Sequence, residues 1–243
     1  ANALGITFLD DGPNVDVSVS GSSLNLTRLD ESAAVVGTDS NALADQPASA
    51  GAIGTVTAST TGLFAADVVA YGRDGAAASN ASAPTYGLVL RDASGTEITN
   101  TTTGVVTTLY VTGNGDTTNA ATEQITLYRV SDTELIGKTS ANVTALSIKM
   151  AADGQLTVDQ LVPLSHQTDG PTAADYDDTL TLSILNATSA NAGVLVEKTT
   201  VVTDGDGDTA TDSAEVNITS AIKVEDDGLY LTPSIGNANL LIN

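Results

Sequence analysis

Apolar and polar residues alternate in short segments along the chain. In most of these segments every second residue is apolar, commonly Val, Leu or Ile, and Gly, Asn or Asp stands at the segment ends. Alternation with a period of two, punctuated by turn-forming residues, predicts β-strands that bury one face. The segments lie at 15–20, 24–29, 53–58, 86–91, 105–112, 124–130, 143–149, 155–159, 179–185, 193–203 and 213–224. We therefore expect an all-β fold, a β-sandwich of Ig-like or Greek-key type.

Helical periodicity is weak throughout the sequence. The pattern favours only short helical turns around residues 40–44 and 159–166. The first of these follows Asp39-Ser40-Asn41, and such residues can cap a turn of helix.

Two short strings near the ends of the chain resemble each other. Ile6 to Gly12 and Ile222 to Gly228 each alternate and then close with Asp-Asp-Gly. The two strings are interpreted as one junction between tandem repeats that occurs twice, although a chance match of short strings gives the same observation.

These junctions define the expected domain organisation. Residues 1–13 are predicted to be the junction with a preceding repeat, and 14–224 the β-sandwich module itself. Within the module, 33–124 is long and rich in loop-forming residues. Residues 225–243 are predicted to form the next junction and the start of a following segment, so that the module is a monomeric unit of a long tandem chain.

The composition gives the predicted fold a strongly negative charge, which limits the partners that it can bind. Eight Lys and Arg stand against 30 Asp and Glu, which gives a formal net charge of −22. Such an acidic surface repels phosphate backbones and anionic lipids, so we expect no nucleic-acid partner and no membrane insertion. Bound cations would neutralise the carboxylates, and oxygen ligands beside glycines favour calcium. The absence of cysteine leaves calcium as the candidate for the stabilising role that disulfides often have.

The most specific motif is an Asp-Gly run between two strand-like segments. Asp204, Asp206 and Asp208 alternate with glycine, and Asp212 follows. Carboxylates at alternate positions of a tight turn can point inward together and surround calcium. A helix-loop-helix calcium loop is disfavoured, because Thr209 occupies its glycine position and both flanks resemble strands. A calcium-binding hairpin turn is therefore predicted, with a solvated acidic turn as the alternative.

The two junctions supply the next candidate ligands. Adjacent carboxylates at Asp10-Asp11 and Asp226-Asp227 could bind calcium between tandem domains, although an ordinary polar turn has the same sequence. Asn114 and Asp116 form a further, less specific candidate pair.

Catalysis is disfavoured. With one histidine, His166, and no cysteine, nearly every nucleophile-and-base arrangement is excluded except paired carboxylates. His166 is interpreted as a packed or hydrogen-bonded structural residue. Glycosidases use paired carboxylates, but sugar sites usually need aromatic platforms, and only 3% of this chain is aromatic. We therefore expect no enzyme.

Several strings together resemble a known group of proteins. They are Phe8 to Pro13, Leu29 to Ser32, Ile125 to Val130, Ala151 to Val158, Leu164 to His166 and Val202 to Ala210. As a set they resemble the repeats of giant repeats-in-toxin (RTX) adhesins, which Gram-negative bacteria export by type I secretion. The resemblance implies a calcium-stabilised β-sandwich on the outside of the bacterial cell, in a protein that attaches cells to surfaces or to other cells, as in biofilms.

Long insertions distinguish the ligand-binding members of such adhesins from plain spacer repeats. The long segment 33–124 is similar to their peptide-binding modules, so the resemblance implies that it is a ligand-binding insertion. The similarity implies that a calcium site holds the C-terminal carboxylate of a target peptide or protein. The candidate ligand-binding residues are Tyr71, Arg73, Asp74, Tyr86 and Arg91. Arginine could pair with the carboxylate and tyrosine could pack against the peptide, whereas surface ion pairs and core-edge packing are their ordinary roles. A structural extender of the adhesin stalk and a calcium-dependent carbohydrate-binding module remain the alternatives.

Overall fold

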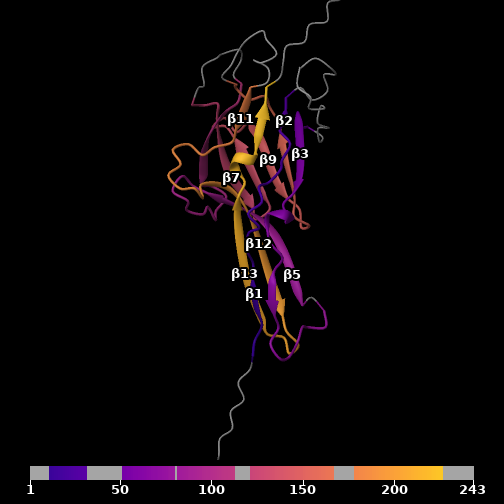
Figure 1. Ribbon diagram of the computed structural model, residues 1–243. Coiled ribbons are helices and arrows are strands. Elements are labelled where there is room, and N and C mark those ends of the chain that lie inside the picture. The colour runs from indigo at the N-terminus through magenta and orange to yellow at the C-terminus, as the bar shows by residue number, and fades with distance from the viewer. Residues whose placement is uncertain (1–10, 32–50, 80, 113–120, 167–177, 227–243) are drawn as a thin grey trace, which may run out of the picture.

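The computed structural model describes residues 11–31, 51–79, 81–112, 121–166 and 178–226. Of the described residues 51% lie in strands and 3% in two short 3-10 turns, Thr61–Leu63 and Thr219–Ala221. The predicted all-β sandwich is confirmed. The described residues form a broad upper body and a narrower lower extension (Figure 1). No helix within these ranges has the length and apolar character needed to cross a membrane.

One layer of the upper body is a six-stranded antiparallel sheet. Its strands, in spatial order, are β3 (Gly54–Ser59), β10 (Gln155–Gln160), β9 (Thr144–Met150), β8 (Glu134–Lys138), β7 (Gln124–Ser131) and β6 (Gly104–Tyr110). In the first half of β7 the buried side chains of Ile125 and Leu127 alternate with partly exposed ones, as the sequence alternation predicts.

Two smaller sheets form the opposite layer. The first has the order β13 (Thr209–Asn217), β12 (Gly193–Thr203) and β5 (Ser82–Arg91), and all of its pairs are antiparallel. The second has the order β11 (Thr179–Thr181), β14 (Lys223–Glu225) and β2 (Leu29–Asp30), in which β14 and β2 run parallel. Backbone hydrogen bonds between β6 and residues 183–185 connect the two layers at one edge.

The main core fills the space between these layers. Leu90 and Val194 from the β5–β12 pair are buried in one cluster with Ile125, Leu127 and Ile148 from the six-stranded sheet. All five of these side chains are fully buried. The core is mainly aliphatic, as the composition requires, and burying each such side chain contributes about 1.5–3 kcal/mol.

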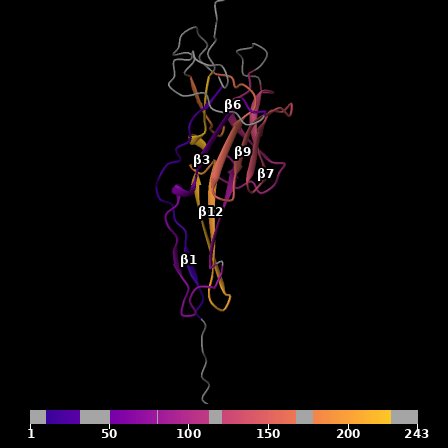
Figure 2. The same ribbon diagram turned by 90° about the vertical axis from the view of Figure 1, so that its right-hand side faces the viewer.

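The lower extension has a small core of its own. The long β12–β13 hairpin and β5 continue below the six-stranded sheet, where β1 (Asn14–Asp16) and β4 (Val68–Ala70) pair beside them (Figure 2). Val15, Val17 and Val202 are buried together between these strands. The hairpin is therefore stabilised along its length and not only at its base.

The described part of 33–124 supplies strands to both layers. It contains β3, β4, β5 and β6, and Leu88, Leu90 and Val105 from it lie in the main core. These strands are integral to the sandwich. The long described loops of this segment are 71–79 and 92–103.

The predicted strand boundaries agree best with the observed ones where the alternation of apolar and polar residues is longest. The segment 193–203 coincides with β12, whereas 24–29 contributes only Leu29 to a strand. The helical turn predicted at 159–166 is wrong, because residues 159 and 160 belong to β10 and Leu164 forms a β-bridge with Val111. The turn predicted at 40–44 lies outside the described residues.

Candidate functional site

The Asp-Gly run forms the turn of the β12–β13 hairpin at the lower tip. The Asp204 amide donates a hydrogen bond to the Asp208 carbonyl at 3.0 Å. In return, Oδ1 of Asp204 accepts hydrogen bonds from the amides of Gly207, at 3.1 Å, and Asp208, at 2.8 Å. Gly207 has φ +105°, a conformation that favours glycine. The turn is thus built around one carboxylate oxygen of Asp204.

A second segment, residues 74–77, packs against this turn. Ala76 forms a β-bridge with Asp204, and the Ala77 amide donates to the Thr203 carbonyl at 3.1 Å. The two chains approach so closely that a Cβ at Gly205 would overlap the Asp74 carbonyl oxygen. The glycine at this position therefore allows Asp74 to reach the hairpin turn.

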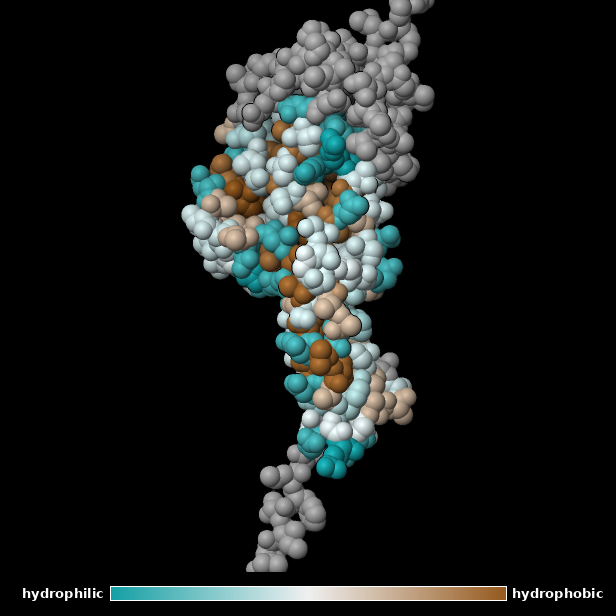
Figure 3. Space-filling view, viewed as in Figure 1, coloured by the Kyte–Doolittle hydropathy of each residue, from teal (hydrophilic) through white to brown (hydrophobic). Residues whose placement is uncertain are grey.

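Three carboxylates meet where these segments join. Asp74, Asp204 and Asp206 each place an oxygen within 4.8 Å of the others. A calcium ion with oxygen ligands at about 2.3–2.6 Å holds opposite ligands no more than about 5 Å apart, so the three oxygens are close enough to share one ion. Hydrophilic residues gather at this tip (Figure 3).

The environments of the three carboxylates differ. Asp204 is 1% exposed, and its Oδ2 is buried with no hydrogen-bond partner. Asp74 and Asp206 are exposed. Burying a carboxylate oxygen without a partner costs several kcal/mol, and a cation is the species that removes this cost. The cluster therefore combines one buried carboxylate with two exposed ones.

The other predicted metal ligands are distributed differently. Oδ2 of Asp212 accepts a hydrogen bond from the Val17 amide at 2.8 Å, which attaches β1 to β13. Asp208 closes the hairpin through its backbone. The Asp11 backbone lies against Gly72, two residues before Asp74. Asp226 follows β14 at the opposite end of the molecule. Asp10, Asn114, Asp116 and Asp227 lie outside the described residues.

The predicted ligand-binding residues do not gather in one pocket. Arg91 makes a two-pronged ion pair with Glu215, with the closest atoms 2.7 Å apart, and the pKa of Arg91 is raised by this hydrogen bonding and charge although burial lowers it. Tyr86 packs on Phe64, with ring centroids 6.2 Å apart. The structure thus gives both side chains intramolecular partners.

Tyr71, Arg73 and Asp74 lie close together in the sequence. Asp74 belongs to the cluster of Asp74, Asp204 and Asp206, which we call the acidic tip. Tyr71 packs against the small lower core, whereas Arg73 is exposed. Asp74, predicted as a ligand-binding residue, lies with the predicted metal ligands. Its proximity to Asp204 depends on the pairing of residues 76 and 77 with the end of β12, which the local sequence does not indicate.

The comparisons with known proteins point to one family. Neither the curated proteins nor the solved structures include a match to this chain. A family model matches residues 26–217, which span most of the chain from the strand β2 region to the end of β13. The chain therefore belongs to the family described as a domain of unknown function, DUF5801.

Proposed function

We propose that the chain is a calcium-dependent module of an extracellular bacterial adhesin of the RTX type, and that it is not an enzyme. The observation that carries this proposal is the acidic tip, where a buried, unbonded oxygen of Asp204 lies beside Asp74 and Asp206. The strings that resemble RTX adhesin repeats and the strongly acidic composition support the same assignment.

Calcium is the ion that this donor set favours. All of the candidate ligands are hard oxygens, and the exposed positions of Asp74 and Asp206 allow water to complete a shell of six to eight ligands. The ion would join the β12–β13 turn to the 74–77 segment. Because that segment follows β4, calcium would fix the lower end of the extension.

The positions of β1 and β14 favour a role for the module as a spacer in the adhesin stalk. β1 lies in the lower extension, and β14 pairs with β2 in the upper body (Figure 1). When the chain enters a module at one end of its long axis and leaves at the other, each module can lengthen a tandem stalk by the length of that axis. Calcium at the tip would then stiffen the region next to the preceding unit.

A second candidate role is calcium-dependent capture of a peptide or protein C-terminus. It is favoured by the exposure of Asp74 and Asp206, which leaves the outer side of the ion accessible, and by exposed Arg73 beside them. A carboxylate would meet a divalent cation and a guanidinium on a surface that otherwise repels anions. Paired sugar hydroxyls could bind the same ion, which is the carbohydrate alternative.

Calorimetry separates these roles. Calcium titrated into chelator-treated protein should bind the wild type, and Asp204→Asn should remove the tip site. Short peptides with free or amidated C-termini are then added in calcium. Binding that requires the free carboxylate supports capture, and glycan-array binding abolished by chelator supports carbohydrate recognition. Absence of any ligand, together with X-ray scattering that changes on chelation, supports spacing. Absence of calcium binding would refute the proposal as a whole.

A further inference from the structure

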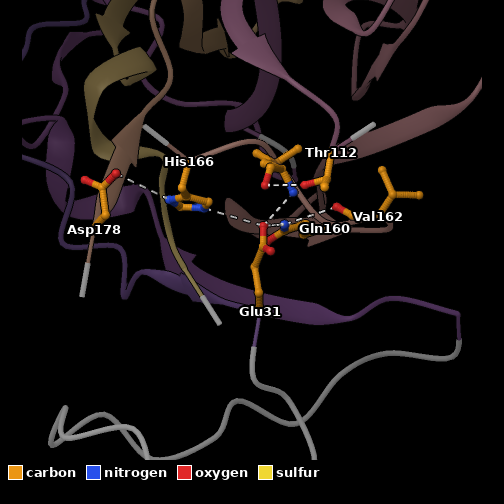
Figure 4. Close-up of polar contacts among 7 residues, drawn as sticks. Glu31, Thr112, Gln160, Val162, His166 and Asp178 are labelled. Atoms are coloured by element: carbon orange, nitrogen blue, oxygen red, sulfur yellow. Dashed lines mark hydrogen bonds and ion pairs between the residues drawn. The ribbon is translucent and has the colours of Figure 1, made fainter. Parts of the chain in front are cut away.

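The only histidine of the chain lies at the upper end of the sandwich, away from the acidic tip. The His166 side chain is 2% exposed and lies between the carboxylates of Glu31 and Asp178 (Figure 4). One ligand atom each from Glu31, His166 and Asp226 lie within 4.8 Å of one another. The group therefore combines an imidazole with carboxylates in a nearly closed site.

The fold brings these residues together from three distant segments. Glu31 directly follows β2 and Asp226 directly follows β14, and these strands are parallel neighbours that end on the same side. The residue preceding His166, Ser165, donates its amide hydrogen to the Tyr110 carbonyl at 2.8 Å. Each of the three residues is thus positioned by a neighbouring β-strand.

Glu31 is held in place by groups other than the His166 imidazole. Its Oε1 accepts hydrogen bonds from the Leu164 amide, at 2.7 Å, and from the Gln160 side chain. The segment that carries the imidazole therefore also orients the carboxylate. A cation would find both groups already positioned.

The imidazole nitrogens lack hydrogen bonds. Nε2 of His166 is 3.7 Å from Oε1 of Glu31, and Nδ1 is 4.0 Å from Oδ2 of Asp178. Both nitrogens are buried with no hydrogen-bond partner. A direct hydrogen bond would be about 2.7–3.2 Å long, so the separation from Glu31 is too large for one. Two ligands about 2.0–2.2 Å from a shared ion are about 3.3–3.7 Å apart at tetrahedral or slightly wider angles, which is close to the observed separation.

The local electric field favours a cation here. Burial lowers the pKa of His166, but the nearby carboxylate of Glu31 and the charges of Asp226 and Asp178 raise it by more, so the pKa stands above its ordinary value. The same negative field attracts a divalent metal ion, which carries twice the charge of a proton.

We propose that Glu31, His166 and Asp226 form a binding site for a divalent transition-metal ion of the zinc class. An imidazole ligand favours zinc-class ions over calcium and magnesium, which prefer all-oxygen shells. His166 would use Nε2, the nitrogen facing Glu31, and water would complete the shell. Asp178, which faces Nδ1, would orient the ring from outside the shell, as carboxylates beside metal-binding histidines commonly do.

This metal ion would stabilise the end of the module at which β14 ends. It would join the segments after β2, before His166 and after β14, whereas the acidic tip joins segments at the opposite end. The zinc site shares no residue with the proposed calcium site, so either can fail without the other.

Imidazole nitrogen NMR tests the site directly, because one histidine gives one unambiguous set of signals. The full chain, without a histidine tag and kept in calcium, is titrated with zinc chloride at pH 8. We expect a large change in the Nε2 resonance, complete at one equivalent of zinc, and no comparable change with magnesium or additional calcium. An imidazole spectrum indifferent to zinc, or equally sensitive to magnesium, would overturn the proposal.

Variants provide the second arm of the experiment. By metal analysis after dialysis, His166→Gln should lose the zinc equivalent, while Asp204→Asn should keep it and lose calcium. If His166→Gln does not fold, Asp178→Asn replaces it, and zinc affinity should fall about 10–100-fold while the dichroism spectrum stays unchanged. Wild-type zinc affinity in both His166→Gln and Asp178→Asn would refute the assignment.

Discussion

Asp204→Asn is the most informative perturbation of the acidic tip. Asn keeps the size of the side chain and one oxygen, so it can still accept the amides of Gly207 and Asp208. What it removes is the charge, together with the buried Oδ2 that has no partner. The variant therefore separates metal binding from the local hydrogen bonding of the turn.

The expected magnitude follows from mass action. An ion that binds only the folded state adds RT ln(1 + [L]/Kd), which is about 4 kcal/mol when calcium is present at about 1,000 times its Kd. For a domain of this size, about 1 kcal/mol corresponds to roughly 2–4 °C in Tm. Wild-type protein should therefore melt roughly 8–16 °C lower in chelator than in calcium, whereas Asp204→Asn should show nearly the same Tm in both.

The assay is thermal melting of zinc-free protein followed by circular dichroism, in calcium and in EDTA. Asp92→Asn is the matched control, because Asp92 is a partly exposed carboxylate that accepts amide hydrogen bonds in another loop, from Ser94 and Thr96. This control should keep the full calcium response. The reasoning is refuted if the wild type melts at one temperature in both buffers, or if Asp204→Asn responds to calcium as the wild type does.

Three further predictions concern the extension, the tip and the core. Lys198→Met should destabilise the protein by about 3–5 kcal/mol in urea denaturation, because the largely buried Asp67, whose oxygen lies 2.6 Å from the Lys198 ammonium, loses its charged partner and keeps only the hydrogen bond from Thr200. The double variant with Asp67→Leu should recover much of the loss, and a cost below about 1 kcal/mol for the single variant would contradict this. Gly205→Ala should weaken calcium binding in calorimetry, because its Cβ displaces Asp74, and unchanged affinity would show that the two segments need not touch. Leu127→Ala should cost about 2–5 kcal/mol with the calcium response unchanged, since Leu127 is fully buried in the main core, and a neutral effect would contradict the described packing.

Alternation along the chain was sufficient to predict the fold class and many of the strands. β12 is long and buries every second side chain over most of its length, so its bounds could be read directly. β8 was missed, because Glu134 to Lys138 is short and contains Gly137. Residues 159–166 were misread as a helical turn because Asp159 and Gln160, both polar, are buried in β10.

The candidate site was only partly predictable. The Asp-Gly run revealed the hairpin turn, because its chemistry is local. Asp74 could not be placed beside Asp204, since this contact depends on a bridge between segments more than a hundred residues apart. Glu31, His166 and Asp226 were each visible in the sequence. The parallel pairing of β2 with β14 brings Glu31 and Asp226 together, and the bridge between Leu164 and Val111 adds His166.

The central claim is that one calcium ion joins Asp74, Asp204 and Asp206. Its most direct test is a crystal structure of the chain grown in calcium, with an anomalous difference map. We predict a peak between these three carboxylates, with oxygen ligands at about 2.3–2.6 Å that include Oδ2 of Asp204. A map without a peak there, in which Oδ2 of Asp204 bonds to water or to protein, would contradict the claim.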